Sequence, residues 1–303
     1  MFELIFLGTS ASAPSAHRGL PAQIVKHNEH RFLVDCGEGT QRQILQSGLG
    51  FRKLGTILVT HGHLDHILGI GGLVSTYRRW EAIDGLRIYA GQTALERIAD
   101  LLFKVVIRDT RPPFPIDLIP VSSGTIISEK GLTVEAFPVN HRGPDCYGYA
   151  FQLDGKRPFL AEKAEALGIP QGPWRRDLAA ETETRLPDGR VIHPDQVLGD
   201  YEPGVRLVLV GDTGETESIE PHCRDAHGLV IESTYIEAER EMAEQFAHLT
   251  ARQAAELATR ANVRQLFLTH LSRRYREKDI EKEAREIFPD AVVVRDFDQF
   301  QIK

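Results

Sequence analysis

The sequence predicts a layered α/β protein, and three features of the chain support this prediction. Short apolar runs of strand length alternate with stretches of helical length or spacing along most of the 303 residues. Hydrophobic residues make up 42% of the chain, which is enough to bury a large core in one or two domains. Polar residues of metal-binding type follow several of the apolar runs, so a functional site is expected at the ends of the strands.

The predicted strands are apolar runs, and the predicted helices are longer stretches with helical spacing. The strands are expected at 1–7, before Asp35, and at 56–59, 134–139, 205–210, 230–232 and 264–268. The helices are expected at 40–49, 64–79, 93–106, 250–261 and 279–288. This alternation is typical of strands that form core sheets and helices that cover them.

The sequence Thr-His-Gly-His-Leu-Asp-His, directly after the strand at 56–59, carries the most specific signal. It places four residues of ligand type within six positions: His61, His63, Asp65 and His66. His61 and His63 can share one side of an extended segment, and the following turn can direct the other two to a second point. Imidazole is a preferred zinc ligand and a carboxylate can bind or bridge, so the motif predicts half of a binuclear zinc site. A polar loop of solvated histidines is the alternative, and the number of ligands disfavours it.

Three further predicted strands end in residues that can complete this site: His141, Asp212 and His270. Each residue alone has an ordinary explanation, because Asp212 can form an Asx turn and either histidine can be a hydrogen-bonded residue at a strand end. Together with the first motif they bring the number of candidate ligands to seven. That number suits two zinc ions that share one carboxylate and leave room for a bridging water.

With these motifs, the chain resembles the metallo-β-lactamase superfamily, in which His-x-His-x-Asp-His after a strand is followed by a distant His, an Asp and a final His. Further stretches are similar to the ribonuclease Z family of tRNA 3′-processing endonucleases. They are Phe-Leu-Gly-Thr-Ser at 6–10, Val-Asp-Cys-Gly-Glu-Gly-Thr-Gln at 34–41, His-Leu-Thr at 248–250 and Thr-His-Leu-Ser-Arg-Arg-Tyr at 269–275. The resemblance therefore covers nearly the whole chain.

The resemblance implies a single metallo-β-lactamase-like domain over residues 1–303, an αββα sandwich with two face-to-face sheets and helices outside. It also implies that one zinc ion is held by His61, His63 and His141, the other by Asp65, His66 and His270, and that Asp212 bridges them. Two Zn²⁺ per chain are therefore expected, with Mn²⁺ as the alternative ion. Asp35, which follows its own apolar strand, is expected to fix the tautomer and orientation of a ligand histidine.

The apolar periodicity lapses from about 154 to 204, where Gly, Pro and polar residues are frequent. A structureless segment this long inside a compact domain is usually functional or disordered, and a solvated insertion is the plain alternative. The ribonuclease Z family carries a protruding arm here that grips the tRNA body. The resemblance implies that Trp174 stacks on nucleotide surface and that Arg175 and Arg176 neutralise phosphate. These arginines would supply the basic patch that a chain of net charge −7 otherwise lacks.

His248 is a candidate catalytic residue outside the ligand set. Thr250 to Gln253 has the pattern of a capping box before a helix, so His248 lies just outside a helix N-terminus that fixes its position. The resemblance implies a general acid or a phosphate clamp, and imidazole suits proton donation near neutral pH. A helix N-terminus lowers the pKa of a histidine, whereas a carboxylate partner raises it. Glu232, at the end of another predicted strand, is the candidate partner, with an exposed carboxylate as the alternative.

Substrate contacts are expected from residues near the ligands and from an N-terminal loop. Arg273 and Tyr275 closely follow His270 and can reach the same cleft as phosphate ligands, or they can begin a solvated helix. Arg18 belongs to the loop Pro-Ser-Ala-His-Arg-Gly at 14–19, where the family has Pro-x-Lys-x-Arg-Asn and uses it to choose the cut position. The Lys and the Asn are absent here, which leaves the response to a 3′-terminal CCA open.

Cysteine usage and hydropathy indicate a cytoplasmic protein without a membrane segment. The three cysteines are odd in number and lack Cys-x-x-Cys spacing, which predicts reduced thiols. No apolar run is long enough to span a bilayer, and the start lacks the basic leader and cleavage site of a signal peptide. The resemblance implies a homodimer in which the arm of one subunit serves the site of the other.

The sequence therefore predicts a zinc-dependent endoribonuclease that cuts precursor tRNA after the discriminator nucleotide and leaves a 3′-hydroxyl on the tRNA. In that mechanism Asp65 or the bridging carboxylate orients the attacking water, and His248 protonates the leaving 3′ oxygen. A phosphodiesterase of the same fold that acts on small diesters is one alternative, and the arm argues against it. A metal-bound RNA-binding module without catalysis is another, and it would need neither His248 nor the full ligand set.

Overall fold

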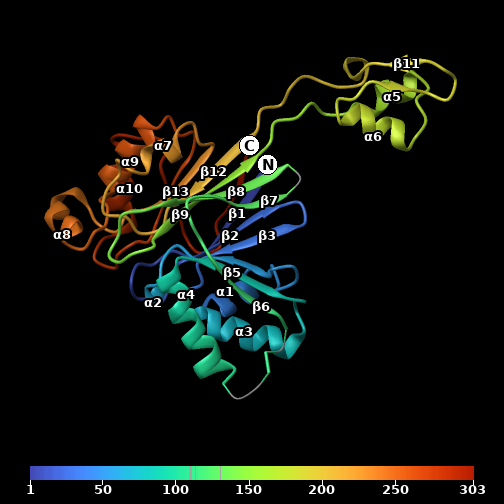
Figure 1. Cartoon of the computed structure of the whole chain (residues 1–303). Coiled ribbons are helices and arrows are strands. Elements are labelled where there is room, and N and C mark those ends of the chain that lie inside the picture. Colours follow the sequence, from blue (N-terminus) through green and yellow to red (C-terminus); the bar gives the residue numbers. More distant parts are fainter. Residues whose placement is uncertain (109–110, 113, 130) are drawn as a thin grey trace. The chain divides into compact units, whose positions relative to one another are not determined.

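The computed structural model describes residues 1–108, 111–112, 114–129 and 131–303. These residues divide into two compact units, one formed by Met1–Gln152 with Arg206–Lys303 and the other by Leu153–Val205. In the larger unit, two seven-stranded sheets lie face to face and helices cover their outer sides (Figure 1). This architecture is the predicted αββα sandwich.

The first sheet has the strand order β16-β1-β2-β3-β4-β5-β6. Its strands are β1 (Phe2–Gly8), β2 (Ala22–His27), β3 (His30–Val34), β4 (Thr56–Leu58), β5 (Leu86–Ala90), β6 (Ile116–Pro120) and β16 (Gln299–Ile302). The strands from β3 to β6 run parallel, whereas β1 pairs antiparallel with β2 and β16. Because neighbouring parallel strands end at the same edge, the segments that follow β3 and β4 lie close together.

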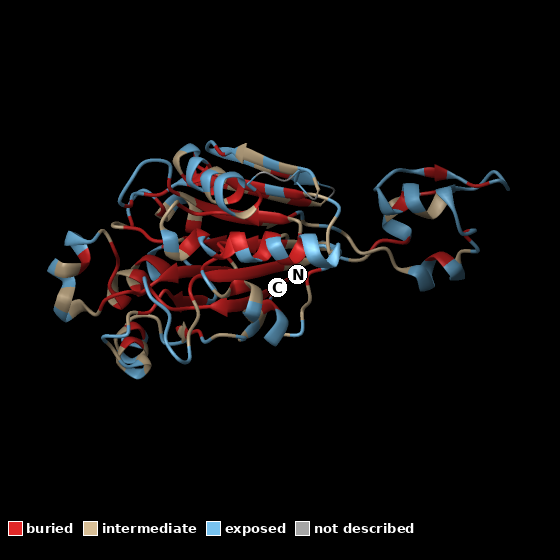
Figure 2. Cartoon of the chain, turned by 90° about the horizontal axis from the view of Figure 1, so that it is seen from below, coloured by how far each residue is buried: buried red, intermediate tan, exposed pale blue. Residues whose placement is uncertain are grey.

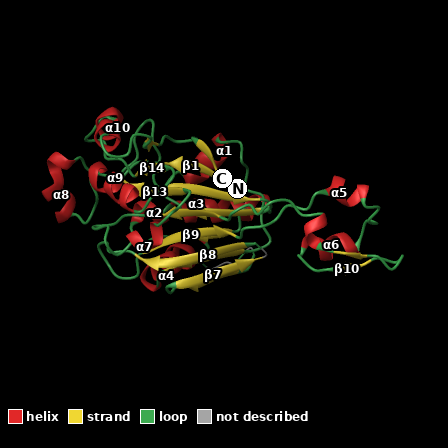
Figure 3. Ribbon diagram, turned by 90° about the horizontal axis from the view of Figure 1, so that it is seen from above, coloured by secondary structure: helices red, strands yellow, loops and turns green. Residues whose placement is uncertain are grey.

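The second sheet has the strand order β15-β14-β13-β12-β9-β8-β7. Its strands are β7 (Gly124–Glu129), β8 (Leu132–Pro138), β9 (Tyr147–Leu153), β12 (Val205–Leu209), β13 (Gly228–Glu232), β14 (Leu266–Thr269) and β15 (Val292–Val293). Figure 3 shows β7, β8 and β9 side by side at one end of this sheet. The strands from β12 to β15 are parallel, so three predicted site segments follow strands that end at one edge.

Helices pack on the outer face of each sheet, and their apolar faces form two buried layers (Figure 2). In α3, Ile70, Leu73, Val74 and Tyr77 are all buried, at the i, i+3, i+4, i+7 spacing of an amphipathic helix. The helices of the first half are α1 (Thr40–Gln46), α2 (Leu64–Ile67), α3 (Gly69–Trp80) and α4 (Gln92–Ala99), which continues as the π-helical segment η1 (Asp100–Val106). Those of the second half are α7 (Glu220–Cys223), η3 (Glu237–Glu239), α8 (Arg240–Gln245), α9 (Ala251–Arg260) and α10 (Glu277–Arg285).

Phenylalanine rings fill the space between the two sheets. Phe151 of β9 lies with its ring centroid 6.0 Å from that of Phe2 and 5.4 Å from that of Phe32, both on the first sheet. Phe6 and Phe267 pair in the same way at 6.2 Å. Aromatic pairs at such distances add to the free energy of burial, so these contacts hold the two sheets against each other.

The predicted helix at 64–79 is interrupted, because the backbone at Leu68 and Gly69 leaves the helical hydrogen-bond pattern. The N–H of Gly69 donates to the carbonyl of Cys36 at 2.9 Å, and the N–H of Cys36 donates to the carbonyl of His66 at 2.8 Å. A side chain at Gly69 would meet the carbonyl oxygen of Gly37 at 2.0 Å, so only glycine fits this close approach. The contact ties the first metal motif to the segment after β3.

The unit Leu153–Val205 is folded, which corrects the expectation of a structureless segment. It contains α5 (Ala161–Ala166), α6 (Pro173–Ala179), the hairpin β10 (Thr184–Arg185) and β11 (Val191–Ile192), and the 3₁₀ turn η2 (Pro194–Gln196). A small core holds it together, formed by Ala164, Ile169, Leu178, Leu186, Ile192 and Val197. The elements are too short for their buried residues to repeat with a recognisable period, which is why the sequence pattern did not reveal them.

Among the described residues, no helix has the length and the apolar character needed to cross a membrane. All three cysteines are buried and unpaired.

Candidate metal centre

Two edges of the sandwich bring the predicted ligands together. Asp35 and His61 follow β3 and β4, which are neighbouring parallel strands of the first sheet. In the second sheet Asp212 and His270 follow β12 and β14, which flank β13. Turns at strand ends carry their side chains beyond the sheet, so residues far apart in the sequence meet at one place.

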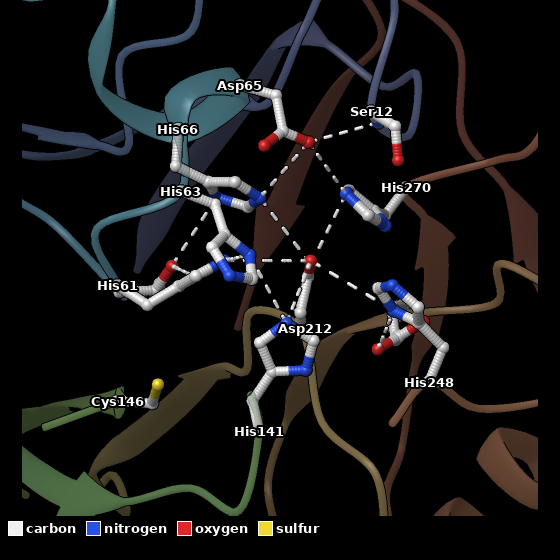
Figure 4. A network of polar contacts seen from close by, with 12 residues as sticks. Ser12, His61, His63, Asp65, His66, His141, Cys146, Asp212, His248 and His270 are labelled. Carbon is white, nitrogen blue, oxygen red and sulfur yellow. Dashed lines mark hydrogen bonds and ion pairs between the residues drawn. The ribbon is translucent and has the colours of Figure 1, made fainter. Parts of the chain in front are cut away.

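The seven predicted ligands form two clusters around Asp212 (Figure 4). Ligand atoms of His61, His63, His141 and Asp212 lie within 4.8 Å of one another, as do those of Asp65, His66 and His270. The Oδ2 atom of Asp212 faces the first cluster, 3.7 Å from the Nε2 of His61 and 3.8 Å from that of His141. Its Oδ1 faces the second, 3.5 Å from the Nε2 of His66 and 3.3 Å from that of His270. One carboxylate thus has one oxygen available for each cluster.

Hydrogen bonds to the Nδ1 atoms orient four of the imidazoles so that Nε2 points into the clusters. The partners are the Asp35 carboxylate for His66 at 2.8 Å, the Ala247 carbonyl for His141 at 2.7 Å, the Thr234 hydroxyl for His270 at 2.9 Å and the Thr60 hydroxyl for His61 at 3.1 Å. His63 is turned the other way, with its Nδ1 2.8 Å from the Nε2 of His61. Such outer partners fix the tautomer and the direction of a metal-ligating histidine.

The buried nitrogens of the second cluster fit a metal ion. In the described part of the chain, the Nε2 atoms of His66 and His270 are buried and have no hydrogen-bond partner. Leaving such an atom unpaired costs about 1–3 kcal/mol, so these two nitrogens indicate a missing ligand at the point they face. In the first cluster, burial lowers the pKa of His61, of His141 and of His63, the last to about 4. The three imidazoles are therefore neutral near pH 7, which is the form that binds metal.

Asp35 and His270 adopt backbone conformations that are unusual for their residue types. Their φ angles are 58° and 55°, in the left-handed region that favours glycine. Such conformations cost on the order of 1–3 kcal/mol and persist where the surroundings enforce them. Asp35 is held in this conformation by the backbone N–H of Thr60, which donates to its Oδ1 at 2.8 Å. The two strained residues are therefore the predicted ligand His270 and Asp35, the hydrogen-bond partner of the predicted ligand His66.

The structure brings His248 and Glu232 together beside the clusters. The Nδ1 of His248 lies 2.9 and 3.0 Å from the two carboxylate oxygens of Glu232. Glu232 is also held by the N–H of Thr213 at 2.7 Å and by the hydroxyl of Thr234 at 2.5 Å. Burial opposes the charged form of His248, but the Glu232 carboxylate outweighs it and raises the pKa of His248 to about 9.

His248 reaches this position through the turn between α8 and α9. The predicted capping box is present, with the Thr250 hydroxyl accepting from the Gln253 N–H and the Gln253 side chain accepting from the Thr250 N–H. The N–H of His248 donates to the carbonyl of Ala243 at 2.9 Å. The carbonyl of Ala247 is the partner of the ligand His141, so the same turn positions His248 and a predicted ligand.

The residues of the larger unit that are predicted to contact RNA differ in their exposure and in their partners. Arg273 is exposed and lines a pocket together with His248. Tyr275 is half-buried, and its hydroxyl donates to Glu239. Arg18 is bonded to the Thr9 hydroxyl and the Val294 carbonyl, both at 2.6 Å, and forms an ion pair with Glu277 at 2.8 Å. These partners engage the guanidinium group of Arg18 within the chain, and its expected role in substrate binding stays a prediction.

The expected RNA contacts of the arm stay predictions, and its three candidate residues have different surroundings within their unit. The guanidinium group of Arg175 donates twice to the Ile169 carbonyl, at 3.0 and 2.8 Å, and Trp174 packs against the core of its unit. These two residues therefore support the unit, whereas Arg176 is exposed. The unit contains seven Lys or Arg and ten Asp or Glu residues, so its net charge is −3 and any basic patch on it must be local.

Several residues around His248 were not anticipated from the sequence. Arg142, Tyr235 and Phe246 line the pocket that His248 and Arg273 share. Arg142 directly follows the ligand His141, a position that marks it as a candidate for the cleft. Phe246 and Tyr235 carry no comparable signal, because an isolated aromatic residue is usually part of a core.

Comparisons with known proteins identify the fold. Residues 30–161 match the family model of the β-lactamase superfamily domain. The structure resembles the metallo-β-lactamase fold protein YhfI from Bacillus subtilis, with a TM-score of 0.71, 17% identity and coverage of 99% of this chain and 98% of that chain. It also resembles the short form of human tRNase Z, with a TM-score of 0.67, 22% identity and coverage of 99% of both chains.

A closer sequence relationship identifies the family. Ribonuclease Z of Bradyrhizobium diazoefficiens is 44% identical over 302 residues, covering 100% of this chain and 100% of that protein. Identity at this level over the full length of both proteins goes beyond a shared fold. This chain therefore belongs to the ribonuclease Z family.

Proposed function

We propose that this protein is a zinc-dependent endoribonuclease that removes the 3′ trailer from precursor tRNA by cutting after the discriminator nucleotide. The chain belongs to the ribonuclease Z family, and one structural observation supports this activity. The Asp212 carboxylate is divided between two clusters of ligand atoms, and the His248–Glu232 pair lies directly beside it, with the Nδ1 of His248 4.0 Å from Asp212. A non-catalytic RNA-binding module would have no use for this pair.

The proposed metal centre holds two zinc ions. His61, His63 and His141 would hold one ion, Asp65, His66 and His270 would hold the other, and Asp212, which faces both clusters, would be shared between them. Bound ions of this kind lower the pKa of a water molecule and neutralise phosphoryl oxygens. Zinc is favoured over harder ions because imidazole nitrogens dominate the ligand set.

Asp65 is proposed to orient the attacking water as well as to bind metal. Burial disfavours its charge, but the neighbouring His270 and His66 more than offset this and hold its pKa below the usual range. The N–H of Ser12 donates to its Oδ2 at 3.0 Å, which fixes one oxygen of the carboxylate. Asp65 is therefore an ionised hydrogen-bond acceptor at the edge of the centre.

His248 is proposed to be the general acid. Its Nδ1 is occupied by Glu232, so the opposite nitrogen, Nε2, is the atom that can donate a proton to the leaving 3′ oxygen. Glu232 acts through His248 as a positioning residue, because it fixes the tautomer and keeps the ring charged. The products are a tRNA with a 3′-hydroxyl and a trailer with a 5′-phosphate.

The unit Leu153–Val205 is proposed to bind the tRNA body away from the cut. Support comes from its independent core and from exposed basic side chains, including Lys163, Arg176 and Arg185. Family resemblance further suggests a cytoplasmic homodimer in which this unit of one subunit serves the site of the other. Binding would then depend on a few exposed basic residues rather than on the net charge of the unit.

The test compares two substrates with the purified protein. A labelled precursor tRNA should be cut at one position, after the discriminator nucleotide. The tRNA should carry a 3′-hydroxyl and the trailer a 5′-phosphate. This reaction should be much faster than hydrolysis of bis-p-nitrophenyl phosphate. Rapid hydrolysis of the small diester without cleavage of the RNA would favour the small-diester phosphodiesterase instead.

A further inference from the structure

We infer that the pocket beside His248 binds the discriminator nucleotide, whose 3′ oxygen is the leaving group, by stacking its base on Phe246. The inference rests on the proposed function, because it uses His248 as the proton donor. It adds Phe246 as a residue that binds the nucleotide on the tRNA side of the cut.

The pocket adjoins the metal centre but is distinct from it. Its volume is about 750 Å³, and among the described residues its wall contains His248 and none of the seven proposed ligands. A smaller neighbouring pocket of about 310 Å³ contains His63, Asp65 and Asp212. Ser12, Arg142 and His248 line both pockets, so the two spaces meet at these residues. A volume of this size is typical of a ligand site.

The position of His248 decides which nucleotide occupies the larger pocket. In an in-line displacement the attacking and leaving oxygens lie on opposite sides of the phosphorus. The water approaches from the side of the ligands, and the leaving 3′ oxygen faces His248. The nucleoside attached to that oxygen therefore extends into the pocket that His248 shares with Phe246, while the trailer extends away from it.

The ring of Phe246 is exposed, and the residues next to it contact the site. The side chain of Phe246 is 37% exposed and lines the pocket, so a face of the pocket is aromatic. The next residue, Ala247, has a φ of 52° and its carbonyl is bonded to the ligand His141 at 2.7 Å. The guanidinium carbon of Arg142 lies 5.7 Å from the centre of the ring. The guanidinium group thus lies over the ring, and an unpaired base can extend this stack.

The charge of the pocket suits the phosphate groups on either side of such a base. Arg142, Arg273 and Arg274 line it, and no acidic side chain of the described residues does. Arg274 is paired with Glu239 at 3.1 Å, whereas the side chains of Arg142 and Arg273 form no ion pair with a described carboxylate. In a chain of net charge −7, this pocket is a local site for a nucleic-acid backbone.

The experiment measures coupling between Phe246 and single nucleotides of the substrate. Three precursor tRNAs are compared in kcat/KM: the intact molecule, one with an abasic discriminator nucleotide, and one with an abasic first trailer nucleotide. The enzymes are the wild type, Phe246→Ala, Phe246→Tyr, and Phe103→Ala as a matched control. Phe103 lies on η1 and is 39% exposed, close to the exposure of Phe246, but does not line the pocket.

Phe246→Ala is expected to lower kcat/KM on the intact precursor by roughly 5- to 100-fold, the usual effect of losing a base–aromatic stack. On the precursor with the abasic discriminator this loss should shrink to within about two-fold, and on the one with the abasic trailer nucleotide it should persist. Phe246→Tyr should keep the wild-type rate because it keeps the ring, and Phe103→Ala should have no effect.

An equal loss on all three precursors, a loss that disappears with the abasic trailer nucleotide, or a defect in Phe246→Tyr overturns the inference. A wild-type enzyme that fails to cut the intact precursor would instead overturn the proposed function.

Discussion

The imidazoles of the site owe their directions to a few hydrogen bonds from residues that bind no metal themselves. Asp35 is the clearest case, because it holds the Nδ1 of His66 at 2.8 Å and is itself held by Thr60. The sequence predicted this role for Asp35 but did not indicate which histidine it serves. That choice depends on the pairing of β3 with β4, which brings Asp35 next to the motif after β4.

Asp35→Asn is expected to weaken zinc binding by about 10- to 100-fold, the usual cost of losing an outer partner of a ligand histidine. The amide keeps the size of the carboxylate but not its charge, so His66 becomes a less basic ligand. Competition with a chromophoric chelator measures the change. Asp117→Asn, at an exposed carboxylate on β6, is the control and should bind zinc as the wild type does. Unchanged affinity in Asp35→Asn would show that His66 is oriented by its packing alone.

His248→Ala should keep both zinc ions and the fold, yet slow the chemical step on RNA by something like 10²–10⁴-fold, the usual contribution of general acid catalysis. A p-nitrophenoxide leaving group needs little protonation, so the defect should shrink on a p-nitrophenyl diester. Glu232→Gln should show the same pattern in weaker form, because the amide no longer holds the ring charged. Loss of zinc from His248→Ala, or a normal single-turnover rate on RNA, would make His248 a structural residue.

At the scale of single elements, strand ends and helix caps could be predicted from local sequence. The motif after β4 and the capping box at Thr250 rest on neighbouring residue types and were found in this way. Glu232 was proposed as the partner of His248 from its position at another strand end, and the structure brings the two together. The break between α2 and α3 could not be predicted, because it depends on the approach of Gly69 to the distant residue Cys36. The pocket around Phe246 was missed for the same reason, since its residues come from separate segments.

Thr250→Ala is expected to lower the free energy of unfolding by about 1–2 kcal/mol, because Thr250 caps α9. Its hydroxyl also donates to Glu237 at 2.8 Å, which places the loss at the upper end of that range. Urea unfolding at a fixed zinc concentration measures it. Thr259→Ala, in the last turn of the same helix, should change stability by less than about 0.5 kcal/mol. Equal effects of the two substitutions would mean that the cap contributes nothing beyond helix propensity.

At the scale of the whole molecule, the two-layer sandwich was predictable and the fold of Leu153–Val205 was not. Short apolar runs alternate with helical stretches often enough to indicate a layered α/β fold, and the family resemblance supplied the arrangement as a sandwich. The smaller unit relies on six buried side chains spread over short elements. The hydrogen bond from Arg175 to the carbonyl of Ile169 could not be foreseen either, because a guanidinium group can bind a carbonyl of its own unit as well as a phosphate.

Replacing residues 154–204 with a short Gly-Ser linker should strongly reduce cleavage of precursor tRNA. Zinc content and hydrolysis of bis-p-nitrophenyl phosphate should remain nearly unchanged, because the proposed ligands and His248 all lie in the larger unit. A deletion of only 168–176 is less informative, since it would remove the buried Ile169 and part of α6. Equal losses on both substrates would indicate that the unit supports the fold of the sandwich.

Seven residues are proposed to build one binuclear metal centre on which activity depends. Elemental analysis of the purified, active protein tests this most directly. Close to two zinc per chain are expected, and His63→Ala and Asp212→Ala should lose metal and cleavage of precursor tRNA together. A chelator should abolish the activity and added zinc should restore it. A fully active protein without bound metal would rule out such a centre.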